Sequence, residues 1–505
     1  MLRVKPDNFA PRTTAFAIAC GLFLAVLSGA GNLAAAAAAI VVGDQKQLFI
    51  DDSFVKQATN VVLRMHPALK TGEQTLVPTQ PWENASLNWF SVLRHDGKFR
   101  MWYECYDVEG WPTTNDTSFC YAESVDGLRW EKPNLGLFNY HGSTNNNILF
   151  REIGPPGAYS RVHGAGVFLD PTAPPAARYK CVSQGMFASS APPYRVAGMV
   201  SADGLRWTRL PNVICDLFAD SQYSAFWDAA GDAFVLYGRV GGRGRAIGRA
   251  PSRDFSHFEP LQLVLENEAA RDLYNPAAVK YPAAANTYLM FPSVYDHQAD
   301  TLAIHLAVSR DGIHWSYPDR ATPFIPLGSP GQFDSGSLYL GQGLVPVRDE
   351  LWHYYSGSPL KHEQATLELL TNAANHRIYS RAKIRLDGYV SAAAGNDDGS
   401  FVTPPLQFKG NALALNVAVR DGGRVRVGLL DEAGRPVPGL TVADCVPITG
   451  DHIRHVVAWN TKTNLSSLAA QPVCLSFQMT KANLFAFQFT DAHPTVNESE
   501  GNQYR

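Results

Sequence analysis

The chain repeats one short motif, Ser-x-Asp-Gly-x-x-Trp, three times. The copies begin at Ser124, Ser201 and Ser309, and a degenerate copy, Ser-Arg-Asp-Phe-Ser-His-Phe, begins at Ser252. A fifth, worn copy is expected around Ser380. A short motif that recurs at intervals of tens of residues is typical of a repeat fold. We therefore use each copy to locate one repeat unit.

Each unit has three short apolar runs before the motif and a fourth strand expected after it. In the first unit these are 90–93, 99–103 and 119–122, with Trp130 opening the fourth strand. In the fourth unit they are 277–281, 287–292 and 302–308, with Trp315. The fifth has 338–346, 350–355 and 377–380 and a less certain fourth strand. Four-stranded antiparallel units arranged radially form a β-propeller. Five units predict a five-bladed propeller over 45–383.

The motif aspartates Asp126, Asp203 and Asp311 are the most conspicuous carboxylates because they recur. The glycine that follows each one supplies the positive φ that a tight turn needs, and the carboxylate can accept backbone N–H groups of the turn. We therefore interpret these aspartates as structural, and we expect the motif tryptophan to pack between neighbouring blades.

The repeat pattern ends at about residue 384. Several strands with alternating apolar residues follow, separated by turn signals such as Asp421-Gly-Gly423 and Glu432-Ala-Gly434. This pattern predicts a C-terminal β-sandwich over 384–491, followed by a polar tail over 492–505. The predicted fold class is all-β.

Residues 1–39 have the features of a signal peptide. Basic residues precede an apolar run over 13–27, and several Ala-x-Ala cleavage sites follow over 34–39. A membrane anchor is the alternative, but the run is short, and no later segment has about 18 unbroken apolar residues. We predict a secreted or periplasmic protein without a membrane partner after cleavage. The net charge of −3 argues against a nucleic-acid partner.

Six cysteines remain after the predicted cleavage. Cys105 with Cys120, and Cys445 with Cys474, could form disulfides, and buried free thiols are the alternative for all six. No Cys/His zinc spacing is present, so no metal site is assigned from spacing. A structural metal ion in the central channel stays an open possibility, and no other cofactor is expected.

These features resemble the five-bladed propeller glycosidases, the superfamily of arabinanases, levansucrases and invertases that includes glycoside hydrolase families 32 and 43. The second strand Met101-Trp-Tyr103 carries part of the resemblance. A group of secreted bacterial members is more similar still, through Leu48-Phe-Ile-Asp-Asp52, Pro81-Trp-Glu83, Cys120-Tyr-Ala-Glu-Ser124, Asn145-Asn-Asn-Ile148, Arg178-Tyr-Lys180 and Leu386-Asp-Gly388. The resemblance implies the propeller, the β-sandwich after it and a carbohydrate substrate. The invertase signatures Asn-Asp-Pro-Asn and Arg-Asp-Pro are absent, so no catalytic residue is transferred by motif.

Glycoside hydrolysis needs two carboxyl groups that flank the scissile bond, an acid and a base or nucleophile. In a propeller, the first strand of each blade points residues at the central channel. Carboxylates near the start of these strands are therefore the candidate catalytic residues. They are Glu83, Asp220, Asp272 and Asp334. For each one the alternative is a carboxylate that caps backbone or pairs with an arginine.

Sugar sites also use aromatic platforms and cationic or imidazole donors. The candidate substrate-binding residues are Trp82, His163, Arg245, Tyr274 and His362. Trp102, Tyr103, Trp352 and Tyr354 alternate within second strands and are expected in blade cores. Asp51 and Asp52 follow a strand-like run, Leu48–Ile50, which either opens the first blade or, as we favour, closes the ring against the last blade.

The sequence thus predicts a secreted glycoside hydrolase-like protein that cleaves a poly- or oligosaccharide. One of Asp220 and Asp272 would be the acid, and Glu83 or Asp334 its partner. A non-catalytic glycan-binding propeller is the rival class. A phosphorylase or transferase is a third possibility, which needs a basic cluster for which Arg161 and Arg245 are the visible members.

Overall fold

The computed structural model describes residues 38–109, 117–151, 162–187, 194–218, 220–268, 271–364, 377–469 and 471–491. The predicted signal peptide apart from Ala38 and Ala39, the polar tail and Arg161 lie outside these residues. Contacts divide the chain into 1–38 and 39–505, and everything below concerns the second unit. Its long elements are all strands, so the all-β class is confirmed.

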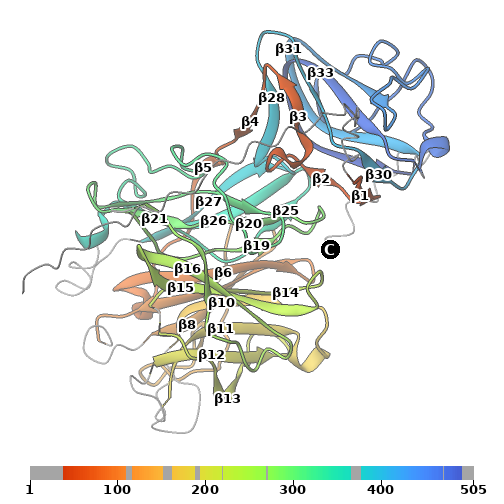
Figure 1. Cartoon of the computed structure of the whole chain (residues 1–505). Helices are drawn as coiled ribbons and strands as arrows, with labels where there is room; N and C mark the ends of the chain where they lie inside the picture. The colour runs from red at the N-terminus through yellow and green to blue at the C-terminus, as the bar shows by residue number, and fades with distance from the viewer. Residues whose placement is uncertain are drawn as a thin grey trace, which may run out of the picture. The chain divides into compact units, whose positions relative to one another are not determined.

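Three four-stranded antiparallel sheets follow one another along the chain, each in simple up-and-down order (Figure 1). The first blade consists of β6 (Ser86–His95), β7 (Lys98–Tyr106), β8 (Ser118–Ser124) and β9 (Ile148–Phe150). The second consists of β10 (His163–Leu169), β11 (Tyr179–Met186), β12 (Tyr194–Ser201) and β13 (Thr208–Cys215). The third consists of β14 (Ser224–Asp228), β15 (Ala233–Gly242), β16 (Gly244–Ser252) and β17 (Gln262–Leu265).

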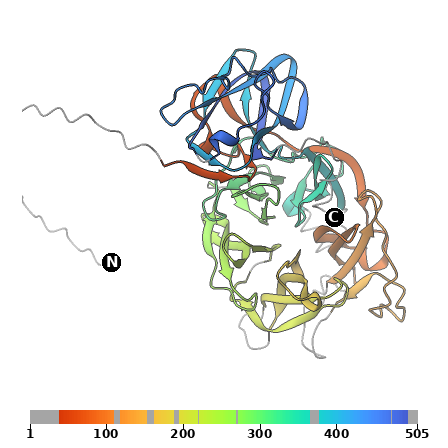
Figure 2. The same cartoon turned by 90° about the vertical axis from the view of Figure 1, so that its right-hand side faces the viewer.

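The last blade is built from both ends of the propeller sequence. It runs β24 (Ser337–Leu340), β26 (Glu350–Ser358), β27 (Ile378–Arg385) and β5 (Leu69–Leu76), with β25 (Val345–Val347) also on β26. The outer strand that the sequence left uncertain is thus β5, which precedes the first blade. Its register sets Leu76 opposite Tyr379 and Leu69 opposite Lys383. The structure shows a propeller arrangement with these four blades around a common centre (Figure 2).

The strands of the fourth repeat, between the third and last blades, fall into two groups. In the first group, β18 (Arg271–Leu273), β21 (Ser293–Asp296) and β22 (Thr301–Ile304) pair with one another and continue into the sheet of the last blade, where Leu302 on β22 lies opposite Ser337 on β24. In the second group, β19 (Val279–Lys280), β20 (Tyr288–Met290) and β23 (Ala307–Ser309) form a separate three-stranded sheet. The single four-stranded unit expected here is therefore interrupted. Pro292 separates β20 from β21, and a proline cannot donate to a strand ladder.

The fourth strand of the first blade starts later than expected. After Trp130 only Glu131 bridges back, to Glu123, and β9 begins at Ile148. Pro133 follows two residues after Glu131 and lacks the N–H that would continue the ladder. The prediction of a strand opening at Trp130 was wrong for this reason.

The motif turns are built as the sequence predicts. Asp126 Oδ1 accepts the backbone N–H groups of Leu128 and Arg129 at 2.8 and 2.9 Å, and Gly127 has φ +72°. The second and third copies repeat this geometry at Asp203 and Asp311. The structural interpretation of these aspartates is confirmed.

Each motif glycine also receives a hydrogen bond from a second-strand aromatic of a neighbouring repeat. Trp102 Nε1 donates to the Gly204 carbonyl at 2.5 Å, and Tyr237 and Tyr354 hydroxyls donate to Gly312 and Gly127 at 2.7 Å. The Tyr354 bond joins the last blade to the first. Trp102, Tyr103, Trp352 and Tyr354 are all buried, as expected for core residues.

Inner strands approach so closely that some positions admit only glycine. A Cβ on Gly164, in β10, would lie 2.1 Å from the Ser221 carbonyl oxygen. We expect Gly164→Ala to lower the free energy of unfolding by about 1–3 kcal/mol through this overlap. Gly97 is the matched control, because it has nearly the same φ (+74° against +71°) and open space around it. Equal losses in the two variants, measured by chemical denaturation, would contradict the steric explanation.

The C-terminal sheet is organised around two long strands. β31 (Ala412–Leu430) and β33 (Cys474–Thr490) pair along most of their length. The apolar runs of the sequence predict two strands in each of these regions, over 413–419 and 424–430 in the first and over 473–477 and 484–489 in the second. The signal Asp421-Gly-Gly423 is a local register shift within β31, between Val419 and Arg424, instead of a hairpin turn. A glycine-rich bulge lets one strand continue across the irregularity.

The remaining strands of this sheet come from both ends of the described chain. They are β28 (Val390–Ala394), β29 (Gly399–Val402), β32 (Asp451–Val456), β2 (Gln47–Leu48), β3 (Lys56–Thr59) and β4 (Val61–Met65). A separate pair joins β1 (Ile40–Gly43) to β30 (Leu406–Phe408). Leu48 pairs with Ala486, so the run at Leu48–Ile50 neither opens the first blade nor closes the ring.

Asp51 has a structural role. Its carboxylate accepts the Ser53 N–H at 3.1 Å at the start of a short 3₁₀ turn and lies 2.8 Å from Arg310. The six cysteines are buried free thiols, with the sulfurs of Cys105 and Cys120 3.6 Å apart. Within the described residues, no helix is both long and apolar enough to cross a membrane.

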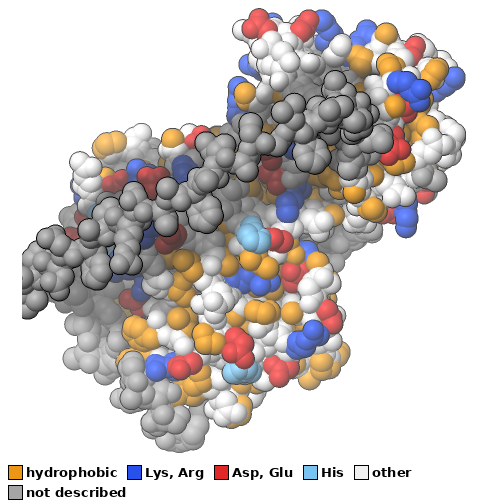
Figure 3. Space-filling view, in the orientation of Figure 1, with side chains coloured by type: hydrophobic (Ala, Val, Ile, Leu, Met, Phe, Trp, Pro, Cys, Tyr) orange, Lys and Arg blue, Asp and Glu red, His pale blue; other side chains and the backbone are white. Residues whose placement is uncertain are grey.

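The face of the molecule in Figure 3 carries acidic and basic side chains interspersed with apolar ones. No continuous basic patch is visible among the coloured side chains on that face. This mixture agrees with the small net charge of −3.

Candidate functional site

Aromatic side chains from different repeats meet in one buried group. It contains Trp89 on β6, Tyr274 next to β18, Tyr295 on β21 and Tyr339 on β24. Ring centroids lie 4.9 Å apart for Trp89 and Tyr339, 6.1 Å for Tyr274 and Tyr339, and 5.9 Å for Tyr274 and Tyr295. The first blade, the fourth repeat and the last blade therefore contribute to one aromatic cluster.

His362 connects two of these tyrosines. Its Nε2 lies 2.5 Å from the Tyr274 hydroxyl and its Nδ1 lies 3.0 Å from the Tyr339 hydroxyl. Burial, together with nearby Arg377, lowers the pKa of His362 to about 4. The ring is therefore neutral near pH 7, and one nitrogen donates while the other accepts.

Asp272 on β18 is a carboxylate that lies against this cluster; another, Asp300, accepts the Tyr295 hydroxyl at 3.1 Å. Its Oδ1 accepts the Arg245 backbone N–H at 2.9 Å, and its Oδ2 lies 2.5 Å from Arg245 Nη1 and 3.2 Å from His297 Nε2. Burial alone would raise the pKa of Asp272, but the bonds from Arg245 outweigh it and the pKa is lowered. Asp272 is therefore ionised at neutral pH.

Three arginines lie over the tyrosine rings. Arg239 and Arg245 lie 5.6 and 5.0 Å from the centroid of Tyr274, and Arg377 lies 4.6 Å from that of Tyr339. Burial lowers the pKa of Arg239 to about 10, with Arg245 as a second cause. Arg239 also pairs with the exposed Asp220, which joins that carboxylate to the cluster.

Sequence reasoning missed Arg239, Trp89, Tyr339 and Arg377. Arg239 and Arg245 lie on the two arms of the β15–β16 hairpin, in which Gly242 pairs with Gly244. This glycine-rich turn between two arginines was a usable signal. Trp89, Tyr339 and Arg377 carry no local signal, because they become neighbours only when the ring of blades forms.

His163 lies in an adjoining polar group. Its Nδ1 is 3.4 Å from Glu104 Oε2 and 3.2 Å from the Tyr106 hydroxyl. Glu104 is fully buried and accepts the Ala165 N–H at 2.7 Å. Asn88 donates to Tyr106 at 2.8 Å, and the next residue is Trp89. Glu104 cannot touch a substrate from this position, but it holds the His163 ring.

Glu83 belongs to a separate buried network. Its carboxylate lies 2.6 Å from Lys132 Nζ and from the Tyr103 hydroxyl, and it accepts the Thr79 N–H at 2.8 Å. Its neighbour Trp82 donates to Asn147 at 3.0 Å and is also buried. The bonds that Glu83 makes with described residues all go to side chains and backbone around it within the fold, which favours the capping and pairing alternative.

Asp334 also lies in its own network. Its Oδ2 is 2.8 Å from Lys70 on β5 and 2.9 Å from the Tyr355 hydroxyl. The carboxylate therefore helps to fasten the closing strand of the last blade. The nine residues selected from the sequence thus divide into three groups. Contacts link Asp220, Asp272, Arg245, Tyr274 and His362, and His163 adjoins this group through β6. Glu83, Trp82 and Asp334 lie in other networks.

The described residues contain no group of three or more His, Cys, Asp or Glu side chains suited to a metal ion. Buried amide oxygens are a different kind of ligand. Gln222, Asn275 and Gln342 each have a side-chain oxygen with no hydrogen-bond partner in the described part of the chain, while their amide nitrogens donate to backbone carbonyls. Such oxygens fit the preference of hard cations.

No protein-family model matches the sequence. No curated protein sequence matches it either. Among solved structures, the chain is similar to a glycoside hydrolase at 15% identity and a TM-score of 0.45, over 63% of this chain and 92% of that one. It is also similar to a glycosyl hydrolase from Bacteroides ovatus at 13% identity and a TM-score of 0.45, over 68% of this chain and 96% of that one. A third is a GH130 protein, from a family described as mannoside phosphorylases that contains glycoside hydrolases of beta-1,2 mannosidic linkages in Candida mannan. The identity to it is 15% and the TM-score 0.43, over 63% of this chain and 94% of that one.

Proposed function

We propose that the protein is a secreted glycoside hydrolase that cleaves a poly- or oligosaccharide. One observation supports this most: an ionised aspartate, three arginines, a neutral histidine and an aromatic cluster meet where several repeats adjoin. Aromatic faces stack on sugar rings, and the polar groups around them hold hydroxyls. The contacts around Tyr274 thus combine an aromatic platform with a carboxylate.

Asp272 is proposed as the carboxylate that acts as base or nucleophile, because Arg245 keeps it ionised. Asp220, which is largely exposed and pairs with Arg239, is proposed as the second carboxyl group of the reaction. Burial raises the pKa of Tyr274, so its hydroxyl stays protonated and can donate to a sugar oxygen. A carboxyl separation of about 5–5.5 Å in a substrate complex would indicate retention, and about 6.5–9.5 Å inversion.

The pH dependence of turnover follows from the pKa values of Asp272 and His362. Asp272 stays ionised below the ordinary aspartate pKa of about 3.9. His362 becomes protonated only near pH 4, when it loses the ability to accept a tyrosine hydroxyl. We therefore expect the acid limb of kcat/KM at pH 4 or below. An acid limb near pH 6, in protein shown to be folded by circular dichroism, would contradict these roles.

The cleavage reaction itself is tested with the purified mature protein. Plant, algal and microbial polysaccharides are screened for new reducing ends, with and without inorganic phosphate. Release without phosphate supports hydrolysis. Binding without release from any of them supports the rival glycan-binding class and overturns the proposal.

A phosphorylase is the second candidate, and the three arginines are the observation that favours it. Arg239, Arg245 and Arg377 provide the basic cluster for which the sequence offered only Arg245 and Arg161. Arginine is well suited to bind phosphate through paired N–H donors. Cleavage that requires phosphate and yields a sugar phosphate would replace hydrolysis by this reaction.

The finer architecture belongs to the same proposal. We propose five blades over 45–383, with the fourth repeat as a divided blade, and a β-sandwich over 384–491. The Tyr237 bond to Gly312 supports the fifth position, because it repeats the contact between other neighbouring repeats. An experimental structure tests the blade count, and N-terminal sequencing of exported protein tests cleavage after residue 39.

A metal ion in the channel also remains part of the proposal. Gln222, Asn275 and Gln342 would hold it through the oxygens described above. It would serve to stabilise the inner strands. Elemental analysis of the purified protein decides whether a bound metal is present.

A further inference from the structure

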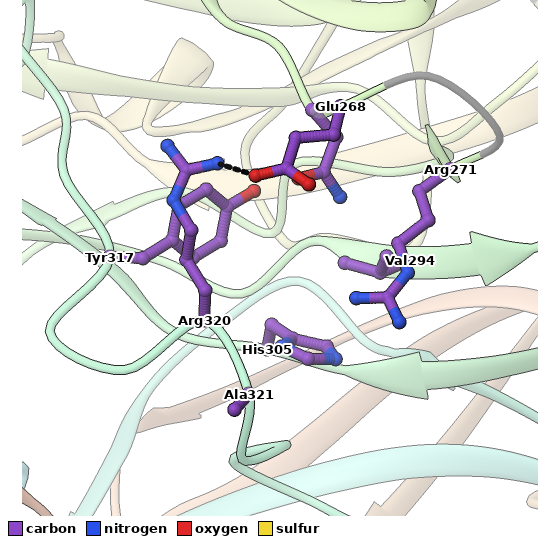
Figure 4. Close-up of a pocket in the computed structure, with 8 residues that line it drawn as sticks. Glu268, Arg271, Val294, His305, Tyr317, Arg320 and Ala321 are labelled. Atoms are coloured by element: carbon purple, nitrogen blue, oxygen red, sulfur yellow. Dashed lines mark ion pairs between the residues drawn. The ribbon is translucent and has the colours of Figure 1, made fainter.

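A pocket lies on the fourth repeat, separate from the aromatic cluster. It has a volume of about 320 Å³ and is lined by Asn267, Glu268, Arg271, His305, Tyr317 and Arg320 (Figure 4). Ligand pockets start at about 300 Å³, so this one suits a single small ring.

Strand alternation keeps the two sites apart although they share β18 and β21. Successive side chains on a strand point to opposite faces. Asp272 contacts Arg245, whereas its neighbour Arg271 lines the pocket and lies 3.3 Å from Asp296. On β21, Tyr295 belongs to the aromatic cluster and Val294 lines the pocket.

Three buried polar groups around the pocket lack protein partners among the described residues. The Tyr317 hydroxyl is buried and has no hydrogen bond. The side chains of His305 and Asn267 are 7% and 8% exposed, and no side-chain bond joins either to a described residue. Buried polar groups in native proteins are nearly always satisfied, so the Tyr317 hydroxyl calls for a ligand or ordered water, and His305 and Asn267 are available to the same ligand.

The charges around the pocket balance one another. Arg271 pairs with Asp296, and Arg320 lies 3.8 Å from Glu268 (Figure 4). Burial and nearby Arg271 lower the pKa of His305 to about 4, so its ring is neutral at pH 7. The three unpartnered groups each offer a donor or acceptor without a net charge. This combination matches hydroxyl groups better than a carboxylate, sulfate or phosphate.

We propose that this pocket binds one neutral sugar residue of a glycan, as a site distinct from the cluster around Asp272. Tyr317 and Val294 provide an apolar wall, and His305, Asn267 and the Tyr317 hydroxyl bind the sugar hydroxyls. The pocket would hold a polysaccharide against the fourth repeat. The inference rests on the proposed function only for the class of ligand, a glycan.

The test is a binding experiment on the purified mature protein. Methyl β-D-galactopyranoside, methyl β-D-xylopyranoside and methyl α-D-mannopyranoside are titrated by calorimetry and by saturation-transfer NMR. We expect at least one to bind. Tyr317→Phe should weaken that binding about three- to tenfold, the loss of one hydrogen bond. Ala321→Trp, at an exposed position on the pocket wall, should abolish it by filling the space.

The control is His257→Gln, an exposed histidine in the degenerate turn of the third blade. It should bind like the wild type. Absence of binding by all three glycosides, or binding that both pocket variants leave unchanged, would overturn the proposal. Tenfold tighter binding of methyl β-D-glucopyranosiduronate would overturn the neutral ligand. Pocket binding in a protein that cleaves no polysaccharide would overturn the proposed hydrolase and leave this site standing.

Discussion

Asp272→Asn is expected to lower turnover about 10²- to 10⁴-fold, the range typical of removing a positioned acid or base. Asparagine keeps the shape of the side chain but cannot carry the charge that Arg245 maintains. The amide oxygen can still accept the Arg245 backbone N–H, which now bonds Oδ1. The melting temperature should therefore change little. Initial rates on the polysaccharide found by the screen, with thermal melts beside them, give the result.

Asp170→Asn is the matched control. Asp170 is also a buried aspartate with a lowered pKa, held by Lys180 at 3.1 Å and by Thr172. It lies at the end of β10, outside the contacts that join Asp272, Tyr274 and His362. Turnover per folded molecule should match the wild type. Wild-type turnover in Asp272→Asn would remove Asp272 from the reaction.

Glu83→Ala is expected to lower the free energy of unfolding by about 3–5 kcal/mol, the cost of breaking a buried ion pair from one side. Lys132, only 13% exposed, would lose its carboxylate, and the Thr79 and Gln80 N–H groups would lose their acceptor. Chemical denaturation at neutral pH measures the loss. The more exposed pair of Lys98 and Glu123, whose side chains are 45% and 26% exposed, gives the comparison, where Glu123→Ala should cost about 1 kcal/mol.

The Glu83 experiment also separates structure from catalysis. A catalytic Glu83 would give the opposite pattern in Glu83→Gln, with turnover lost and stability kept. That result would return Glu83 to the catalytic candidates. It would also contradict the internal hydrogen-bond network as the reason for its burial.

Local chemistry made part of the fold predictable from sequence. Asp-Gly turns determine their own geometry within four residues, so the Ser124, Ser201 and Ser309 motifs located strands correctly. Long-range pairing was not predictable in the same way. Nothing within 69–76 indicates that its partner is 378–385, and nothing at Asp421-Gly-Gly423 indicates a bulge instead of a hairpin.

The candidate site shows the same division. Asp272 and Arg245 lie 27 positions apart in sequence. Asp272 was selected as a carboxylate near the start of a first strand, and Arg245 as a possible cationic donor. Tyr339 and Arg377 belong to the site only because closure of the ring places the last blade next to Trp89 and Tyr274. Glu83 and Asp334 were selected by their position near the start of a strand. Sequence position does not reveal that the fold places a lysine next to each carboxylate.

The closing strand β5 also affects the order in which the fold can form during synthesis. The chain emerges from its N-terminus, yet β5 pairs with β27, and β2, β3 and β4 pair with β33, β29 and β28. These first strands have no partner until nearly the whole polypeptide has been made. Such distant pairings are slow to form because long loops must close first.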